Sequence, residues 1–273
     1  MSAPTPLDAR ARGGGLLERA VQARWPVAAA LVLLLCVVWQ AAGAAALLPD
    51  YIFTPTAIAA AFFRALPDRL PGETLATLRR QLPGFLLGTT LGVLIGLWAG
   101  MFRAVDDLTS PLVSLTYPLP KIALFPVLVV WLGFGDAPRI AIVALACLYP
   151  ALVNAAAAAR GIDRRKIWVA RNYGAGSFRI FRQVVMRDAA GLVIVGVRIA
   201  LALSFVVVFS TEAISARSGL GALIMDGYQN VQYDDMYAGM VTLGLLGFLA
   251  DRLLLWASAP LVRGQQLRAI GRG

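Results

Sequence analysis

Six long apolar segments constrain the fold of this chain more than any other feature. A helix needs roughly 20 apolar residues to cross a bilayer core of about 30 Å, because every backbone polar group must be paired inside the segment. Segments of about this length run from Val27 to Leu48, Pro83 to Met101, Pro111 to Gly133, Arg139 to Ala159, Ala189 to Thr211 and Tyr237 to Ala257. The sequence therefore predicts an all-α fold, a polytopic membrane helical bundle with about six transmembrane helices.

The composition agrees with a membrane protein and excludes several other classes. Hydrophobic residues make up 59% of the chain and charged residues 15%, against roughly 45–50% and 25% in soluble domains. The net charge of +10 could indicate nucleic-acid binding, but the arginines lie in the connections between apolar segments, where topology explains them. The chain has no histidine, and Cys36 and Cys147 lie far apart in apolar runs. We therefore expect no catalytic residues, metal site, cofactor, disulfide framework or nucleic-acid partner.

The distribution of lysine and arginine between the connections predicts the orientation. Short cytosolic loops carry the excess of these residues. With a cytosolic N-terminus, the cytosolic side receives Arg10, Arg12, Arg19, Arg24, Arg103, the cluster between Arg160 and Arg187, Arg263, Arg268 and Arg272. Both termini are thus predicted to be cytosolic. The first apolar segment is too long, and too deep in the chain, for a cleaved signal peptide.

These assignments divide the chain into three parts. Residues 1–24 are predicted to form a cytosolic tail, residues 25–261 the transmembrane domain and residues 262–273 a basic cytosolic tail. The segment from Thr56 to Leu82 is too polar to span a membrane. We expect one or two amphipathic helices there on the external side, interrupted at Pro67 and Pro71.

The loop of residues 160–188, between the fourth and fifth spans, is the most basic part of the chain. The apolar residues Ile167, Ala170 and Tyr173 recur at near-helical spacing, and a second helical pattern containing Phe178 and Phe181 follows Gly174 and Gly176. Two short amphipathic helices joined at a glycine would form a protruding knob that fits a partner's groove. The residues alone equally allow an ordinary basic loop whose aromatic side chains lie at the membrane interface.

Polar residues inside apolar spans are candidates for the pore or its gate, because a charge at mid-membrane costs about 2.5–3.5 kcal/mol on insertion scales. Arg198 is placed too deep to reach the headgroups easily. A structural pair with an acidic or carbonyl partner is favoured for it over contact with an anionic substrate. Lys121 follows two prolines, which favours a gating or structural role near the inner headgroups. Asn154 is expected to hydrogen-bond between helices.

Glu212 lies near the external end of the fifth span, just before the sequence S-G-L-G at residues 218–221. Gly219 and Gly221 would allow a tight re-entrant turn that forms part of an external gate. The alternative is that Glu212 lies at a solvated helix end.

Several motifs together resemble one family of membrane proteins. The loop of residues 160–188 is similar to the coupling motif of ATP-binding cassette importer permeases, written E-A-A, three residues, G, nine residues, I, one residue, L-P. Its positions fall on Trp168, Val169, Ala170, Gly174, Val184, Met186 and Arg187. Ala170 and Gly174 match the family in identity, whereas Trp168 replaces glutamate and Arg187 replaces proline.

The resemblance covers roughly residues 48–261. Five segments are similar to the branch of this family that imports nitrate, sulfonates, taurine and related compounds. They read P-L-P-K-I-A-L-F-P-V-L-V-V-W-L-G-F-G, Y-P-A-L-V-N, V-A-R-N-Y-G-A, V-R-I-A-L-A and S-G-L-G. The resemblance implies the type I importer permease fold and a bacterial inner-membrane location. It also implies two permease copies around one pore, a cytosolic ATPase dimer and an extracytoplasmic substrate-binding protein. The residues it implies for ATPase coupling are Trp168, Ala170, Gly174, Phe178, Phe181 and Val184.

Two rival classes fit the residues less well. A secondary transporter driven by an ion gradient would show inverted repeats and membrane carboxylates, and neither is evident in the sequence. A membrane-embedded enzyme would need histidines, paired carboxylates or a nucleophile motif. The chain also lacks the Walker A pattern, since neither Lys121 nor Lys166 follows a glycine. ATP hydrolysis is therefore expected on a separate subunit.

Overall fold

The computed structural model describes residues 27–49, 51–116 and 118–270, with the backbone alone for residues 262–270. The chain forms two compact units, residues 1–61 and residues 62–273. Regular structure in the described residues is helical throughout. The predicted tail of residues 1–24 lies outside the described residues.

The first unit contains an apolar helix and the start of a second one. The helix Val27–Ala44 has a mean hydropathy of 2.2, and its side chains are largely exposed within the unit. The side-chain oxygen of Gln40 accepts hydrogen bonds from the backbone N–H and the hydroxyl of Thr56, both at 3.2 Å. The predicted first span is thus a helix, which ends at Ala44 rather than at Leu48.

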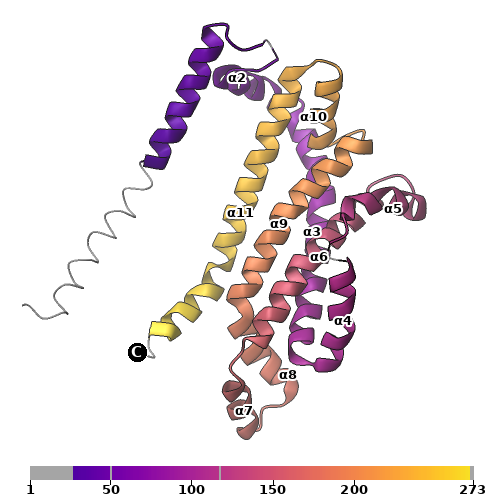
Figure 1. The fold of residues 1–273 in the computed structure, drawn as a ribbon, viewed down its shortest axis with the longest axis vertical. Helices are drawn as coiled ribbons and strands as arrows, with labels where there is room; N and C mark the ends of the chain where they lie inside the picture. Colours follow the sequence, from indigo (N-terminus) through magenta and orange to yellow (C-terminus); the bar gives the residue numbers. More distant parts are fainter. Residues whose placement is uncertain (1–26, 50, 117, 271–273) are drawn as a thin grey trace, which may run out of the picture. The chain divides into compact units, whose positions relative to one another are not determined.

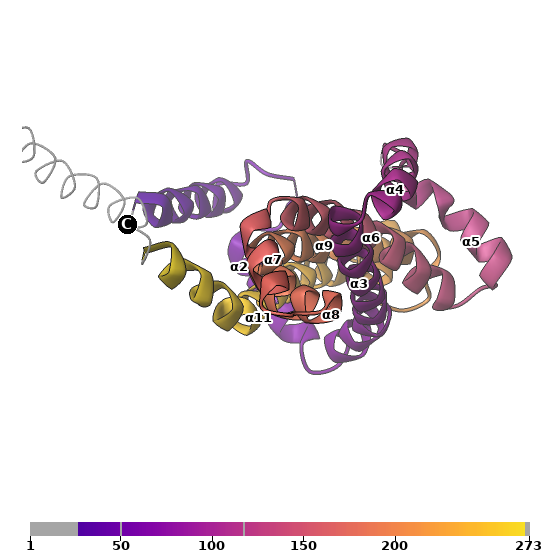
Figure 2. The same ribbon diagram turned by 90° about the horizontal axis from the view of Figure 1, so that it is seen from below.

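The second unit is built on long helices that lie side by side. α3 (Leu70–Met101), α6 (Ala137–Arg160) and α9 (Met186–Ser215) form its centre, as Figures 1 and 2 show, and α11 (Tyr233–Ile270) packs against α9. Within the described residues, five helices are long and apolar enough to cross a membrane, or six if one bent pair counts as a span. This confirms the predicted bundle of about six transmembrane helices.

A stripe of glycines brings α3 into close contact with α6. It comprises Gly84, Gly88, Gly92, Gly96 and Gly100, one residue in every four. A Cβ atom added at Gly92 would lie 2.9 Å from the Cβ of Ala151, and one added at Gly96 would lie 2.9 Å from the Cβ of Ala155. Because lipid supplies no hydrophobic drive between helices, such close backbone approach is a main source of helix association in membranes.

The third predicted span, Pro111 to Gly133, is not one helix. α4 (Arg103–Thr116) is followed by the 3₁₀ turn η1 (Lys121–Leu124) and α5 (Phe125–Leu132), and the two halves meet at 90°. Pro118 and Pro120 account for the break, since proline removes a backbone donor and clashes with the preceding turn. The break therefore falls in the middle of the predicted segment and not at its start.

The predicted external segment from Thr56 to Leu82 is partly wrong. α2 (Pro55–Ala65) ends before Pro67 as expected, but from Leu70 onward the chain belongs to the long helix α3. Pro71 lies in the first turn of α3, where proline costs no hydrogen bond, and Pro83 lies inside it. Arg69 and Arg80 of this region pair with acidic side chains elsewhere in the second unit.

At the other end of the bundle, α6 leads into the loop of residues 160–188. α7 (Arg164–Asn172) is capped by the Asp163 carboxylate, which accepts a hydrogen bond from the backbone N–H of Arg165 at 2.9 Å. After the turn at Gly174, α8 (Ser177–Ile180) passes through the π-helical turn η2 (Phe181–Val185) directly into α9. The second short helix predicted for this loop is thus the first part of the fifth span, not a separate element.

The remaining helices complete the end of the bundle away from this loop. α10 (Leu220–Gln229) packs against α9 and α11, and its start contacts α3. α11 continues to Ile270, so its helix runs through most of the region predicted as the tail of residues 262–273.

Candidate functional site

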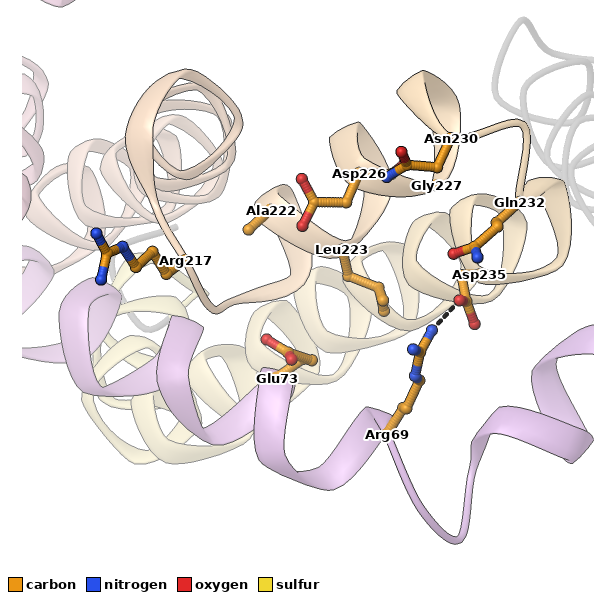
Figure 3. Close-up of a pocket in the computed structure, with 10 residues that line it drawn as sticks. All are labelled: Arg69, Glu73, Arg217, Ala222, Leu223, Asp226, Gly227, Asn230, Gln232 and Asp235. Carbon is orange, nitrogen blue, oxygen red and sulfur yellow. Dashed lines mark hydrogen bonds and ion pairs between the residues drawn. The ribbon is translucent and has the colours of Figure 1, made fainter.

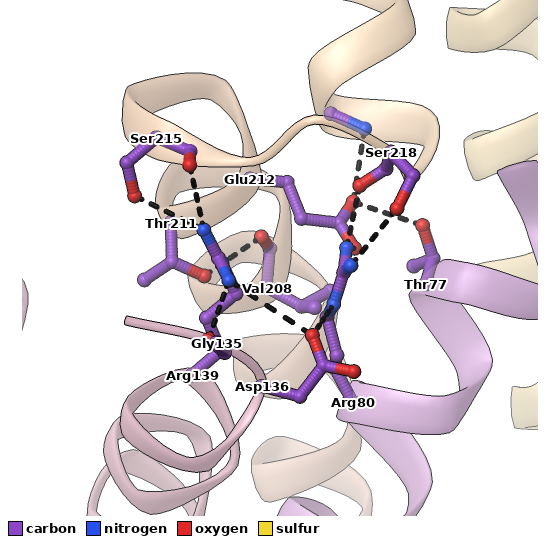
Figure 4. A network of polar contacts seen from close by, with 12 residues as sticks. Thr77, Arg80, Gly135, Asp136, Arg139, Val208, Thr211, Glu212, Ser215 and Ser218 are labelled. Atoms are coloured by element: carbon purple, nitrogen blue, oxygen red, sulfur yellow. Dashed lines mark hydrogen bonds and ion pairs between the residues drawn. The ribbon is translucent and has the colours of Figure 1, made fainter. Parts of the chain in front are cut away.

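A buried polar network joins α3, α9 and the turn before α10 (Figure 4). α10 and α7 lie at opposite ends of the bundle (Figure 1). The Glu212 side chain is fully buried. One of its carboxylate oxygens accepts a hydrogen bond from Arg80 Nη1 at 2.8 Å, and the other accepts from Thr77 Oγ1 at 2.9 Å and from the Gly221 backbone N–H at 3.0 Å. We call these residues, with Asp136, Arg139, Ser215 and Ser218, the Arg80–Glu212 network.

Arg80 is the centre of this network. Its Nη1 also donates to the backbone carbonyl of Ser218 at 2.5 Å and its Nη2 to the Ser218 hydroxyl at 3.0 Å, while its Nε donates to Asp136 at 2.6 Å. A buried ion pair is tolerated only when further hydrogen bonds satisfy both partners. Arg80 and Glu212 meet this condition, so the network fixes three elements against one another.

A second arginine extends the network to α6. Arg139 Nη1 donates to the Gly135 carbonyl at 2.5 Å, and Nη2 donates to the carbonyl and hydroxyl of Ser215 at 2.7 and 3.1 Å. Gly133 and Gly135, at φ +78° and +142°, form the turn that leads into α6 and positions Asp136 for Arg80. These positive φ angles favour glycine.

The S-G-L-G sequence forms a tight turn around Glu212, as the sequence suggests. Gly219 has φ +115°, and a Cβ atom there would collide with the Glu212 carboxylate. A Cβ atom at Gly221 would lie 2.7 Å from the Cβ of Glu212. Glu212 is therefore enclosed by the turn, and the alternative of a solvated helix end is wrong. Its partner Arg80 is absent from the predicted site residues, because its segment was assigned to the external side.

A mixed-charge pocket of about 280 Å³ lies beside this network (Figure 3). Its lining includes Arg69 and Glu73 from the start of α3, Asp226 from α10 and Asp235 from α11. Arg69 pairs with Asp235, and the Glu73 carboxylate accepts a hydrogen bond from the Gly219 backbone N–H. Glu73 thus links the pocket to the S-G-L-G turn of the Arg80–Glu212 network.

Lys121 lies at mid-height of the bundle and not near one end. Its ammonium is 4.5 Å from the centre of the Tyr149 ring, and the Tyr149 hydroxyl donates to Thr116 Oγ1 at 2.7 Å. Tyr149 is near the middle of α6, roughly 17 Å from either end at 1.5 Å per residue. The structure therefore places Lys121 beside the middle of α6 and not beside either of its ends, because the chain breaks before Lys121 and turns by 90°.

Arg198 and Asn154 both form hydrogen bonds in the structure. Arg198, on α9, forms a two-pronged ion pair with Asp251 of α11, at 2.5 and 2.9 Å, and its side chain is 49% exposed. The partner is acidic, as the structural interpretation expects, but the pair is not buried. Asn154 donates to the Pro150 carbonyl at 2.8 Å. This bond lies within α6, so the expected hydrogen bond between helices is not formed, although Asn154 packs against Gly196 of α9.

The loop of residues 160–188 presents an exposed aromatic surface. Trp168, Tyr173 and Phe178 are 66%, 88% and 76% exposed. Phe181, Ala170 and Val184 instead pack on a buried cluster formed by α3, α6 and the start of α9. Gly174 has φ +75° and turns the chain between α7 and α8. The loop therefore has an inner face that packs on the bundle and an outer face that is exposed.

Comparison with known proteins identifies the family. Residues 88–261 match the model of the binding-protein-dependent transport system inner membrane component. The chain belongs to this family. It is 33% identical over 201 residues to a probable ABC transporter permease protein of Brucella abortus strain 2308, which covers 74% of this chain and 80% of the relative.

Two further comparisons concern a relative with a named substrate class and a solved structure. A putative aliphatic sulfonates transport permease protein, SsuC, of Escherichia coli K12 is 32% identical over 216 residues, 78% of this permease and 82% of that protein. A chain in a structure described as inward-facing conformations of the MetNI methionine ABC transporter superposes with a TM-score of 0.52 at 23% identity, covering 71% of this permease and 94% of that chain. The permease is thus a multi-pass inner-membrane protein with the importer permease fold.

Proposed function

We propose that this permease forms the pore of an importer together with a second copy of itself, and that a separate cytosolic ATPase dimer drives it. The observation that carries the proposal is the loop of residues 160–188, whose aromatic outer face is exposed while its inner face is anchored in the bundle. Such a protruding knob fits a groove on a partner. ATP binding and hydrolysis would move this knob and switch the pore between two packed states.

The opposite end of the bundle would receive an extracytoplasmic substrate-binding protein. The family description names such a protein, and the positive-inside rule places residues 160–188 on the cytosolic side. With both termini cytosolic, the Arg80–Glu212 network and the mixed-charge pocket lie on the outer side. Glu212, Gly219 and Gly221 would then form part of the external gate. The exposed apolar side chains of the spans would contact lipid or the second copy.

The expected test of the coupling role is the Gly174→Val change. Valine at φ +75° is strained by about 1–3 kcal/mol, although a Cβ atom at this position has nothing within 4 Å. We expect the altered turn to move Tyr173 and Phe178, and so to lower ATP-driven uptake by proteoliposomes at least fivefold, without loss of membrane insertion. The recovery of the ATPase in co-purification is expected to fall in parallel.

Gly176→Val is the matched control for this change. Gly176 lies two residues further along in extended backbone, at φ −67° and ψ 161°, and a Cβ atom there also meets nothing within 4 Å. It should therefore leave uptake near the wild-type rate. Equal uptake by the two variants and the wild type would show that the turn at Gly174 does not couple the subunits.

We further propose that the solute is a small anion of the sulfonate type. The Escherichia coli relative is named for aliphatic sulfonates, and the Lys121 ammonium lies over the ring of Tyr149, near the middle of the long helix α6. An ammonium carries three donors, and hydrogen bonds to charged groups contribute about 1.5–3 kcal/mol each. Lys121 is therefore suited to stabilise an anion halfway along the pore.

Neutralising Lys121 should lower anion passage. We expect Lys121→Gln to reduce the uptake of a radiolabelled sulfonate about tenfold, which corresponds to about 1.4 kcal/mol, while Lys121→Arg keeps most of it because the charge remains. Uptake is measured at equal amounts of assembled complex. A similar loss in both variants would indicate a packing role over Tyr149, and no loss in either would exclude Lys121 from the path of the anion.

A further inference from the structure

α7 is held to the bundle by a small set of contacts. It has nine residues and none of them is buried, and a helix this short is not stable by itself in water. Its apolar attachment consists of Ile167 and Ala170, which pack on the cluster that contains Val185 and Ala189. Its charged attachment is an ion pair between Lys166 and Asp188.

The ion pair connects α7 directly to the first turn of α9. Asp188 is the acidic residue of that turn, and the side chains of Lys166 and Asp188 are 35% and 20% exposed. The polypeptide that connects the same two helices is longer and more flexible than this direct contact. It passes through the Gly174 turn and the π-helical turn η2, and both are departures from α-helical geometry that allow bending.

α9 continues without a break from this contact to the external network. One α-helix runs from Met186 to Ser215, and at 1.5 Å per residue Asp188 and Glu212 lie about 36 Å apart along it. Glu212 is held by Arg80 of α3 and by the turn before α10. A shift or tilt imposed on the start of α9 is therefore applied to the Arg80–Glu212 network, because a regular helix moves as a rigid rod.

We infer that the Lys166–Asp188 ion pair is the positioning contact through which α7 moves α9, so that breaking it uncouples ATP hydrolysis from solute passage. This inference rests on the proposed function. α7 receives the motion of the ATPase, Lys166 transfers it to Asp188, and α9 carries it to the gate. Neither residue contacts solute or nucleotide in this account.

The test is the number of solute molecules imported for each ATP hydrolysed. In proteoliposomes with the ATPase and the binding protein, Asp188→Asn is expected to hydrolyse ATP within about twofold of the wild-type rate and to lower solute imported per ATP at least tenfold. The charge-reversed pair, Lys166→Asp with Asp188→Lys, should bring this ratio back to within about threefold of the wild type. Asp106→Asn is the control, since it breaks the Arg160–Asp106 pair outside α7.

The outcomes separate the inference from a structural role and from the proposed function. A purely structural role of the pair would lower complex assembly, hydrolysis and uptake together and leave the ratio unchanged, which would overturn the inference. A wild-type ratio in Asp188→Asn, or a reversed pair as defective as the single variant, would overturn it as well. If the wild type shows no ATP-driven uptake, the proposed function fails and the inference fails with it.

Discussion

Replacing Gly92 by valine is expected to leave almost no folded permease in the membrane. A Cβ atom at this position would collide with the Leu148 carbonyl and lie 2.9 Å from the Cβ of Ala151. The obstacle is largely backbone, so rotation of a side chain cannot relieve it and α3 must separate from α6. We expect a destabilisation of about 3 kcal/mol or more, at the upper end for an overpacked interior.

Gly244→Val provides the matched control. Gly244 lies in α11, is exposed within the described structure, and a Cβ atom there has nothing within 4 Å. Size-exclusion chromatography in detergent measures the fraction of monodisperse protein, and a thermal melt measures its stability. Gly244→Val should resemble the wild type, whereas Gly92→Val should aggregate. Equal profiles for the two variants would show that α3 and α6 do not pack through the glycine stripe.

Removing Arg80 has the second large expected effect. Arg80→Met leaves the Glu212 carboxylate fully buried without its arginine, and breaking a buried ion pair in this way costs about 3–5 kcal/mol. The variant should therefore melt at a markedly lower temperature. It should also let solute leak through proteoliposomes without ATP, because the S-G-L-G turn loses its hydrogen bonds to Arg80.

Two further variants test whether the loss of stability comes from the unpaired charge of Glu212. Arg80→Met combined with Glu212→Gln should recover most of the lost stability, since a neutral amide at position 212 needs no cation. Arg79→Met removes an exposed arginine next to Arg80 and should change little. A double variant that melts no higher than Arg80→Met would indicate that Arg80 acts mainly through Asp136 and Ser218, contrary to the role given to Glu212.

The fold could be predicted from the sequence where the signal lies in one segment. The uninterrupted apolar runs of the first, fourth, fifth and sixth spans all form helices in the structure. The third span was mispredicted although Pro118 and Pro120 are visible in the sequence, because proline position alone does not fix where a bent helix divides. The glycine stripe of α3 could also have been found, since its five members recur at every fourth residue.

The polar network was harder to predict because its parts come from distant segments. Glu212 and the S-G-L-G turn are adjacent in sequence, so their association could be inferred. Arg80 lies more than a hundred residues earlier, in a stretch whose charges resemble those of an external helix. Arg80 and Glu212 each look unfavourable for a membrane when taken singly, and only the packing of α3 against α9 shows that they neutralise each other.

A photo-crosslinking residue placed at Tyr173 tests the central claim most directly. Tyr173 lies at the Gly174 turn and is 88% exposed, whereas Phe134, in the connection between α5 and α6, is 96% exposed and serves as the control. After irradiation of native membranes, mass spectrometry identifies the proteins joined to each position. We expect a P-loop ATPase joined to Tyr173 and not to Phe134. No ATPase adduct at Tyr173 in folded permease, or an equal adduct at Phe134, would contradict the account.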